Sequence, residues 1–244
     1  MSDLTPSALT IEYIGKAYTP YNEKFAIPRQ PGIVTHASGH IELFDQQQAS
    51  QMLQGIEQYS HIWVIFGFHA TAPHGWKAMV RPPRLGGNKK MGVLATRSTY
   101  RPNPIGMSVV KLDGISQRES KTLINISGMD LLNETPIIDI KPYVPYADAL
   151  TNATSSFAQE ADSTINVTFS STALNAIEQF DAQHKNLKAL ITQVLAQDPR
   201  PAYKKDQDDK KRYGMNLFQL NITWHMINKT TAHVCNIEPV NNEN

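Results

Sequence analysis

The first 143 residues alternate between short apolar runs and Gly- or Pro-containing breaks, and this pattern constrains the fold more than any other feature. Runs rich in Ile, Val, Thr and aromatic residues predict seven strands, at 9–17, 33–44, 61–68, 91–96, 107–112, 123–128 and 137–140. Only residues 46–57 predict a helix in this part, with Asp45 as its N-cap. Strands and helices therefore do not alternate as they do in βαβ units. Because closure removes exposed sheet edges, we expect a mainly β fold built on a closed, non-Rossmann β-barrel.

The composition changes after Pro145. Residues 148–162 are rich in Ala, Thr, Ser, Asn and Gln and predict a linker. A strand at 164–170, a helical stretch at 172–196 and a hairpin of strands at 217–227 and 231–237 follow. We therefore expect two domains, a β-barrel domain at 1–147 and a smaller α+β C-terminal domain at 148–244.

Positive charge is concentrated in one part of a chain that is nearly neutral overall, with 23 Lys and Arg against 22 Asp and Glu. Residues 58–112 contain no carboxylate, and their basic residues include Lys77, Arg81, Arg84, Lys89, Lys90, Arg97 and Arg101. Gly, Pro and aromatic residues separate these charges, which is typical of shaped loops rather than of a solvated helical face. The stretch favours a polyanion or a phosphate-bearing ligand, with a solvated basic surface as the alternative.

Several classes of protein are disfavoured by what the sequence lacks. The single cysteine, Cys235, excludes a disulfide framework and a Cys-cluster metal site, and no other metal site is expected. The longest apolar run, 62–68, is far shorter than the about 20 residues of a membrane-spanning helix, and no signal sequence precedes it. We expect a cytoplasmic protein with no membrane association. The glycine fingerprint of Rossmann domains, the phosphate-binding loop and the nucleophile elbow are also absent.

Three segments present polar side chains on stiff backbone. Residues 25–32 place Arg29 and Gln30 between two prolines, and residues 95–106 place two arginines in a loop stiffened by proline. In residues 136–143 the alternation puts Asp139, Lys141 and Tyr143 on one face of a strand. Each segment alone is compatible with turn chemistry and a surface ion pair. Together they predict a rigid pocket that is rich in hydrogen-bond donors.

These segments resemble those of the TsaA-like, TrmO-type family of tRNA methyltransferases. The resemblance is carried by residues 28–32, 59–63, 81–88, 95–106, 136–143 and 196–203, and it extends from Ile11 to about Pro239. It implies a β-barrel methyltransferase domain with a smaller C-terminal domain that aids tRNA binding, working as a homodimer. It also implies methyl transfer from S-adenosylmethionine to N6 of N6-threonylcarbamoyladenosine at tRNA position 37.

The resemblance further implies a cofactor site close to the subunit interface. Carried over residue by residue, the family's S-adenosylmethionine-binding positions are Pro28, Arg29, Gln30, His69, Arg97, Met107, Ser127, Gly128, Met129 and Asp130. The residue pattern alone would not single out Met107 or Ser127.

Methylation of N6 requires a proton acceptor, because the nitrogen of a threonylcarbamoylated adenine is urea-like and its lone pair is delocalised. Asp139 is our candidate for this role, since it is the carboxylate in the most specific segment. An ion pair with Arg97 or Arg101 that only holds the barrel mouth is an equally good interpretation.

The substrate should be bound by basic side chains. Arg84, Arg101 and Lys141 are candidates for the threonyl carboxylate, with Arg84 preferred because prolines fix its loop. Further tRNA contacts are expected from Lys77, Lys89, Lys90, Tyr143 and Arg200. The charged tract 204–212 is another candidate, but its aspartates nearly cancel its positive charge, and a solvated loop is the favoured interpretation there. Two other functions stay open at this point, a non-catalytic cofactor- or tRNA-binding module and a small-molecule methyltransferase on the same barrel.

Overall fold

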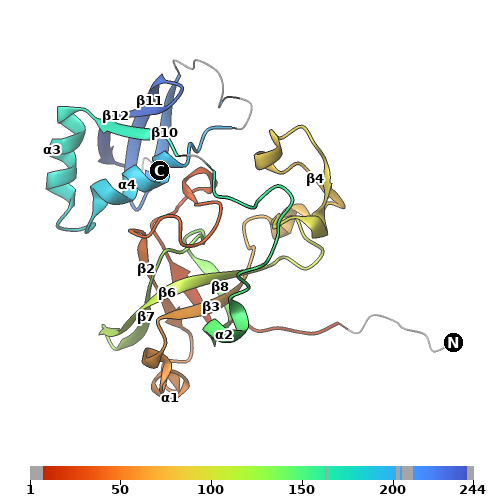
Figure 1. The fold of residues 1–244 in the computed structure, drawn as a ribbon. Coiled ribbons are helices and arrows are strands. Elements are labelled where there is room, and N and C mark those ends of the chain that lie inside the picture. Colours follow the sequence, from red (N-terminus) through yellow and green to blue (C-terminus); the bar gives the residue numbers. More distant parts are fainter. Residues whose placement is uncertain (1–7, 163, 202–203, 205–210, 241–244) are drawn as a thin grey trace.

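The computed structural model describes residues 8–162, 164–201, 204 and 211–240. Figure 1 shows a ring of strands with two bodies beyond its upper end: the C-terminal sheet with its helices, and a lobe of loops that contains strand β4. We call residues 69–104 the basic lobe. It leaves the ring after β3 and returns to it at β6.

Six antiparallel strands form the ring, and each pairs with both of its neighbours. They are β1 (Gly15–Tyr18), β2 (Ser38–Leu43), β3 (His61–Gly67), β6 (Ile105–Arg118), β7 (Lys121–Ser127) and β8 (Thr135–Pro142). The order is β1-β2-β7-β6-β3-β8, and β8 pairs with β1 to complete the circuit. Alternate residues such as Ile62 and Val64 are buried inside, as expected when successive side chains point to opposite faces. The expected mainly β architecture is confirmed.

Two parts of the N-terminal half differ from expectation. Residues 91–96 do not join the ring: β5 (Met91–Gly92) pairs with β4 (Met79–Val80) in a separate hairpin of the basic lobe. The predicted helix 46–57 is reduced to α1 (Ala49–Met52), because Gly55 takes a left-handed conformation with φ of 87° that ends regular helix. Short 3-10 turns lie at Lys24–Ala26, Ile56–Gln58, Ala72–His74, Pro83–Leu85 and Val93–Ala95.

The C-terminal part is an α+β unit, as expected. Its elements are β9 (Asn166–Phe169), α3 (Ser171–Phe180), α4 (Leu187–Ala196), β10 (Arg212–Leu217), β11 (Leu220–Asn228) and β12 (Thr231–Pro239). The sheet order is β10-β11-β12-β9, with β9 parallel to β12. The sequence pattern did not predict β10, and it predicted one helical stretch where α3 and α4 are separate. They are separate because Asn186 is left-handed, with φ of 64°, and Asp181 accepts a hydrogen bond from the backbone N–H of Leu187.

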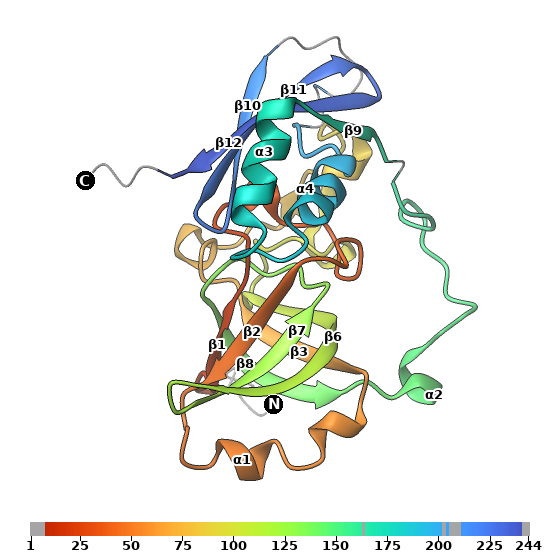
Figure 2. The same ribbon diagram turned by 90° about the vertical axis from the view of Figure 1, so that its left-hand side faces the viewer.

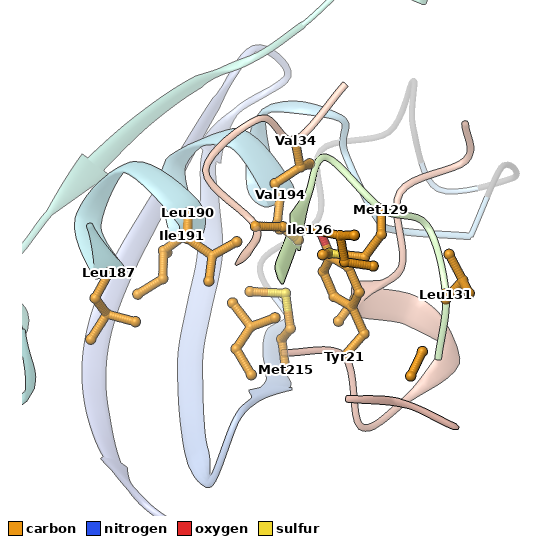
Figure 3. Close-up of a cluster of buried hydrophobic side chains, with 14 of the residues drawn as sticks. Tyr21, Val34, Ile126, Met129, Leu131, Leu187, Leu190, Ile191, Val194 and Met215 are labelled. Carbon is orange, nitrogen blue, oxygen red and sulfur yellow. The ribbon is translucent and has the colours of Figure 1, made fainter. Parts of the chain in front are cut away.

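One hydrophobic core joins the ring to the C-terminal unit. Figure 3 shows Leu190 and Val194 of α4 packed toward Val34, Ile126 and other buried side chains of the N-terminal half. Polar contacts flank this core. The Gln193 side chain accepts a hydrogen bond from the backbone N–H of His36 and donates one to Thr35.

A long connection runs along one side of the molecule from α2 (Pro145–Asp148) to β9, as Figure 2 shows. Its described residues between 149 and 165 contain no helix or strand. Across the described residues, no helix is both long and apolar enough to cross a membrane.

Candidate active site

The segment that carries Arg29 and Gln30 is bound edge to edge to the loop that follows β7. Gly32 donates its backbone N–H to the carbonyl of Gly128, and Gly128 donates its own N–H to the carbonyl of Ala37. Both glycines have positive φ, 78° and 71°. This conformation favours residues without a Cβ. The glycines therefore let the two predicted cofactor-binding segments, 28–30 and 127–130, lie side by side.

A pocket of about 450 Å³ lies at this junction. It is lined by Pro31, Gly32, Thr35, His61, Val109, Lys111, Ser127 and Gly128. Its volume falls within the range of about 300–1,000 Å³ that small-molecule sites occupy. Two of the predicted cofactor-binding residues, Ser127 and Gly128, line it directly.

Asp130 is a largely buried carboxylate close to this pocket. It accepts a hydrogen bond of 2.6 Å from the Ser108 hydroxyl of β6. Burial raises the pKa of Asp130 above its ordinary value, opposed by the bond from Ser108, by the residue's own backbone N–H and by the charge of Arg97. A carboxylate held in this way attracts a cation, because bringing a positive charge beside it offsets the cost of desolvation.

Arg97 reaches from the basic lobe to the segment 28–30, where it donates a hydrogen bond to the Gln30 side chain. The remaining cofactor candidates are placed differently. Pro28 is buried, His69 is half-buried at the start of the lobe, and the Met129 side chain is in the shared core. Met107 is 58% exposed on the outside of the ring.

Arg29 and Arg84 meet at one carboxylate, that of Asp162 in the connection before β9. Arg29 Nη1 is 2.9 Å from Asp162 Oδ2, and Arg84 Nε is 2.9 Å from Asp162 Oδ1. Arg84 also donates a hydrogen bond to the backbone carbonyl of Glu160. A residue predicted to bind cofactor and a residue predicted to bind substrate thus share one anionic partner.

The basic lobe presents its other charges in two ways. Arg101 binds the backbone of its own loop, because it donates a 2.7 Å hydrogen bond to the carbonyl of Thr96. Lys77 lies 4.5 Å from the centroid of the Tyr100 ring, whereas Lys89 is exposed. Trp76, beside Lys77, is 58% exposed. Cations and an exposed aromatic ring on one surface suit contact with single-stranded nucleic acid.

Asp139 and Lys141 lie on the outer face of β8, on one side of the strand as predicted. Their charged groups are 3.3 Å apart, so the partner of Asp139 is Lys141 and not Arg97 or Arg101. Asp139 and Met107 both pair with Ile65, from opposite sides. Tyr143 lies farther along the same face, with its ring 6.0 Å from that of Trp63.

Arg200 is placed unlike the other substrate candidates. Its side chain is fully buried and forms two hydrogen bonds of 2.8 Å with Asp198. This geometry favours a structural role inside the C-terminal unit over a contact with a tRNA phosphate. Within the charged tract 204–212, residues 205–210 lie outside the described residues, as do 202 and 203 of the C-terminal signature.

Sequence reasoning missed three participants of the site. Ser108 is a buried strand residue, and its alternation in β6 signals only that it points inward. Gly32 and Asp162 act through partners about 96 and 78–133 residues away along the chain, and no local pattern reports such contacts. The one signal in the sequence was that the basic lobe contains no carboxylate, so an anion that pairs with its arginines has to come from outside the lobe.

Comparisons with known proteins agree over most of the chain. The model for the tRNA-methyltransferase O N-terminal domain matches residues 16–149, and the model for the TrmO C-terminal domain matches residues 162–240. A tRNA (adenine(37)-N6)-methyltransferase of Escherichia coli (strain K12) is 42% identical over 221 residues, 90% of this chain and 94% of its own length. A putative S-adenosylmethionine-dependent methyltransferase, RcsF, of Pseudomonas aeruginosa is 46% identical over 226 residues, 91% of this chain and 93% of its own. A crystal structure of TrmO from Pseudomonas aeruginosa superposes with a TM-score of 0.79 at 37% identity, covering 95% of this chain and 99% of the other.

Proposed function

This chain belongs to the tRNA-methyltransferase O family, and from that premise we propose how its residues hold the cofactor and the substrate. It is an S-adenosylmethionine-dependent tRNA (adenine(37)-N6)-methyltransferase. We propose that the adenosine it methylates carries an N6-threonylcarbamoyl group. The convergence of Arg29 and Arg84 on one carboxylate supports this substrate, because the threonyl group carries a carboxylate close to N6.

We propose that the pocket between residues 31–35 and Ser127–Gly128 holds S-adenosylmethionine, in the ring domain at 1–147. The residues present fit this cofactor. Asp130 offers a buried negative charge to a sulfonium cation, and Arg29 and Arg97 offer donors to an amino-acid carboxylate. When bound, the cofactor supplies an activated methyl group. The task left to the protein is to align the acceptor nitrogen and remove its proton.

Asp139 is our proposed proton acceptor. Its carboxylate is half exposed beside Lys141, and its Oδ1 also accepts the backbone N–H of Ile140, so the group stays oriented on the outer face of β8. Lys141 keeps a positive charge 3.3 Å from the carboxylate. Asp139 and Met107 flank Ile65 on the outer face, so this carboxylate lies near one predicted cofactor-binding position, Met107.

We propose that tRNA lies across the basic lobe and the C-terminal domain, 148–244. Lys77, Lys89 and Lys90 supply charge for the phosphates in a part of the chain without carboxylates. On the ring, we propose Lys141 of β8 and Tyr143, which directly follows β8, as further contacts. We also propose that the chain works in the cytoplasm, because its proposed substrate is tRNA.

A homodimer is proposed from the outer face of the ring. Met107 and Ile105 of β6 are exposed apolar residues, and the partly exposed Trp63 and Ile65 of β3 lie beside them. A second copy of the chain would cover this apolar surface and place its own residues next to the cofactor candidates. Sedimentation equilibrium at micromolar concentration should give the mass of two chains. A single-chain mass would contradict the proposal.

The function is tested by incubating the chain with labelled S-adenosylmethionine and tRNA that carries or lacks the threonylcarbamoyl group. Mass analysis of the digested nucleosides should show one added methyl group on the modified adenosine. Methylation of unmodified tRNA alone would contradict the proposed substrate. Cofactor binding without any methylated nucleoside would favour the binding module or the small-molecule methyltransferase.

Replacing Arg84 by Ala should reduce the preference for threonylcarbamoylated over unmodified tRNA about 10- to 100-fold, the equivalent of losing a charge-assisted hydrogen bond. The measurement is the ratio of kcat/KM on the two tRNAs. Arg81→Ala, an exposed arginine three positions earlier in the same lobe, is the matched control for general loss of tRNA binding. Equal losses on both tRNAs with Arg84→Ala would argue against a contact with the threonyl carboxylate.

A further inference from the structure

Asp162 contacts the two arginines as the carboxylate of a bound ligand would. Each carboxylate oxygen faces a different guanidinium at 2.9 Å, one from the segment 28–30 and one from the 3-10 turn Pro83–Leu85. The two arginines are 55 residues apart in sequence and come from different loops. Like charges brought this close require an anion between them, because otherwise their repulsion would separate the loops.

The anion that fills this position belongs to an irregular connection. Asp162 lies in the connection between α2 and β9, whose described residues form no helix or strand. The side chains of Asp162, Arg29 and Arg84 each keep about a third of their surface exposed, at 37%, 33% and 29%. A carboxylate from solution therefore has access to both guanidiniums. The connection can withdraw without breaking a hydrogen-bonded ladder.

We propose that Arg29 and Arg84 form a carboxylate-binding site, and that Asp162 is its internal occupant until a ligand carboxylate displaces it. This inference rests on the proposed function, in which two carboxylates reach this site. One is the threonyl carboxylate of the modified adenosine, and the other is the amino-acid carboxylate of S-adenosylmethionine. The shared chemistry is the same, a planar carboxylate with one oxygen on each guanidinium.

Because Asp162 already occupies the arginine pair, the site selects ligands that carry a carboxylate. A ligand with a carboxylate replaces one pair of ionic hydrogen bonds by an equivalent pair, so the exchange costs little. A ligand without a carboxylate would have to leave both arginines unsatisfied or remain outside the site. Asp162 is thus a specificity-determining residue that touches neither reacting atom.

The test compares Asp162→Asn with Glu160→Gln. Both substitutions remove one negative charge from the same stretch. Among the described residues Glu160 meets Arg84 through its backbone carbonyl, so Glu160→Gln should behave as wild type. Removing a partly exposed competing ion pair should tighten binding of the displacing ligand about three- to tenfold. The dissociation constant of S-adenosylmethionine is measured by calorimetry, and KM is measured for threonylcarbamoylated and unmodified tRNA.

The ligand whose binding becomes tighter in Asp162→Asn is the one that occupies the site. A lower cofactor dissociation constant assigns the site to the methionine carboxylate, and a lower KM confined to threonylcarbamoylated tRNA assigns it to the substrate. Asp162→Glu, which retains the anion, should restore wild-type values. The proposal is overturned if Asp162→Asn weakens both ligands or leaves both unchanged, because Asp162 would then only hold the arginines in place. Failure of the wild-type chain to methylate threonylcarbamoylated tRNA would instead refute the proposed substrate, and the calorimetric arm would still report on the site.

Discussion

Asp130→Asn is expected to weaken S-adenosylmethionine binding about 10- to 100-fold. The substitution keeps the shape of the side chain and removes a buried negative charge that we place beside the sulfonium. At a separation of about 4 Å and an effective dielectric constant of about 20, such a pair is worth up to about 4 kcal/mol before desolvation is subtracted. Calorimetry of cofactor binding measures the effect. Glu134→Gln, which removes an exposed carboxylate 3.6 Å from Lys16, is the control and should bind cofactor normally.

The same substitution should stabilise the folded chain at neutral pH. Burial raises the pKa of Asp130 in the folded state, so the folded chain binds a proton more tightly than the unfolded chain does. Stability contributed by this group is present at low pH and is lost as the pH rises from the unfolded value through the raised folded value. The asparagine side chain does not ionise, so Asp130→Asn does not lose this stability as the pH rises. Thermal unfolding between pH 3 and 8 should therefore show a smaller decline for Asp130→Asn than for wild type.

Asp139→Asn should distinguish the role of a proton acceptor from that of a cofactor-binding residue. We expect turnover at saturating cofactor and tRNA to fall about 100-fold or more, with cofactor affinity unchanged. If Asp130→Asn lowered turnover while cofactor binding stayed normal, and Asp139→Asn had wild-type turnover, the roles assigned to the two carboxylates would be wrong.

The strands could be predicted wherever local pattern and tertiary role agree. β3 and β7 begin and end within two residues of the predicted bounds, because their apolar runs are flanked by turn residues and fill the inside of the ring. Residues 91–96 have the same local preference for strand. They form a two-residue strand and a 3-10 turn in the basic lobe because the lobe offers only β4 as a partner. Local preference does not encode which sheet a segment joins.

In the candidate site, too, local pattern predicted some features and could not predict those that depend on tertiary contacts. Stiff, donor-rich segments identified the 28–30 and 95–106 regions, and the structure links them through Gln30 and Arg97. Sequence could not show that Arg200 is buried against Asp198, because a motif records residue identity and not exposure. Nor could it show that Asp162 occupies the arginine pair, since that contact depends on how the chain returns to the ring after more than a hundred residues.

Leu190→Ala should lower the free energy of unfolding by about 2–5 kcal/mol, because it removes a side chain that is 1% exposed in the core between ring and C-terminal unit. Leu94→Ala, at a position that is 76% exposed, is the control and should change stability little. Trp63 of the ring and Trp224 of the C-terminal sheet are natural probes, read separately in variants that retain one of them and lack Trp76.

Because the core is continuous, both probes should report one shared denaturation midpoint, displaced equally by Leu190→Ala. Separate midpoints, with only the Trp224 transition shifted, would show that the C-terminal unit unfolds alone. The distinction bears on function. Pro31, Gly32 and Thr35 line the pocket, and Thr35 accepts a hydrogen bond from Gln193 of α4. Asp162, in the connection to β9, pairs with both arginines. If the core couples the two parts, loosening α4 by Leu190→Ala should also weaken cofactor binding.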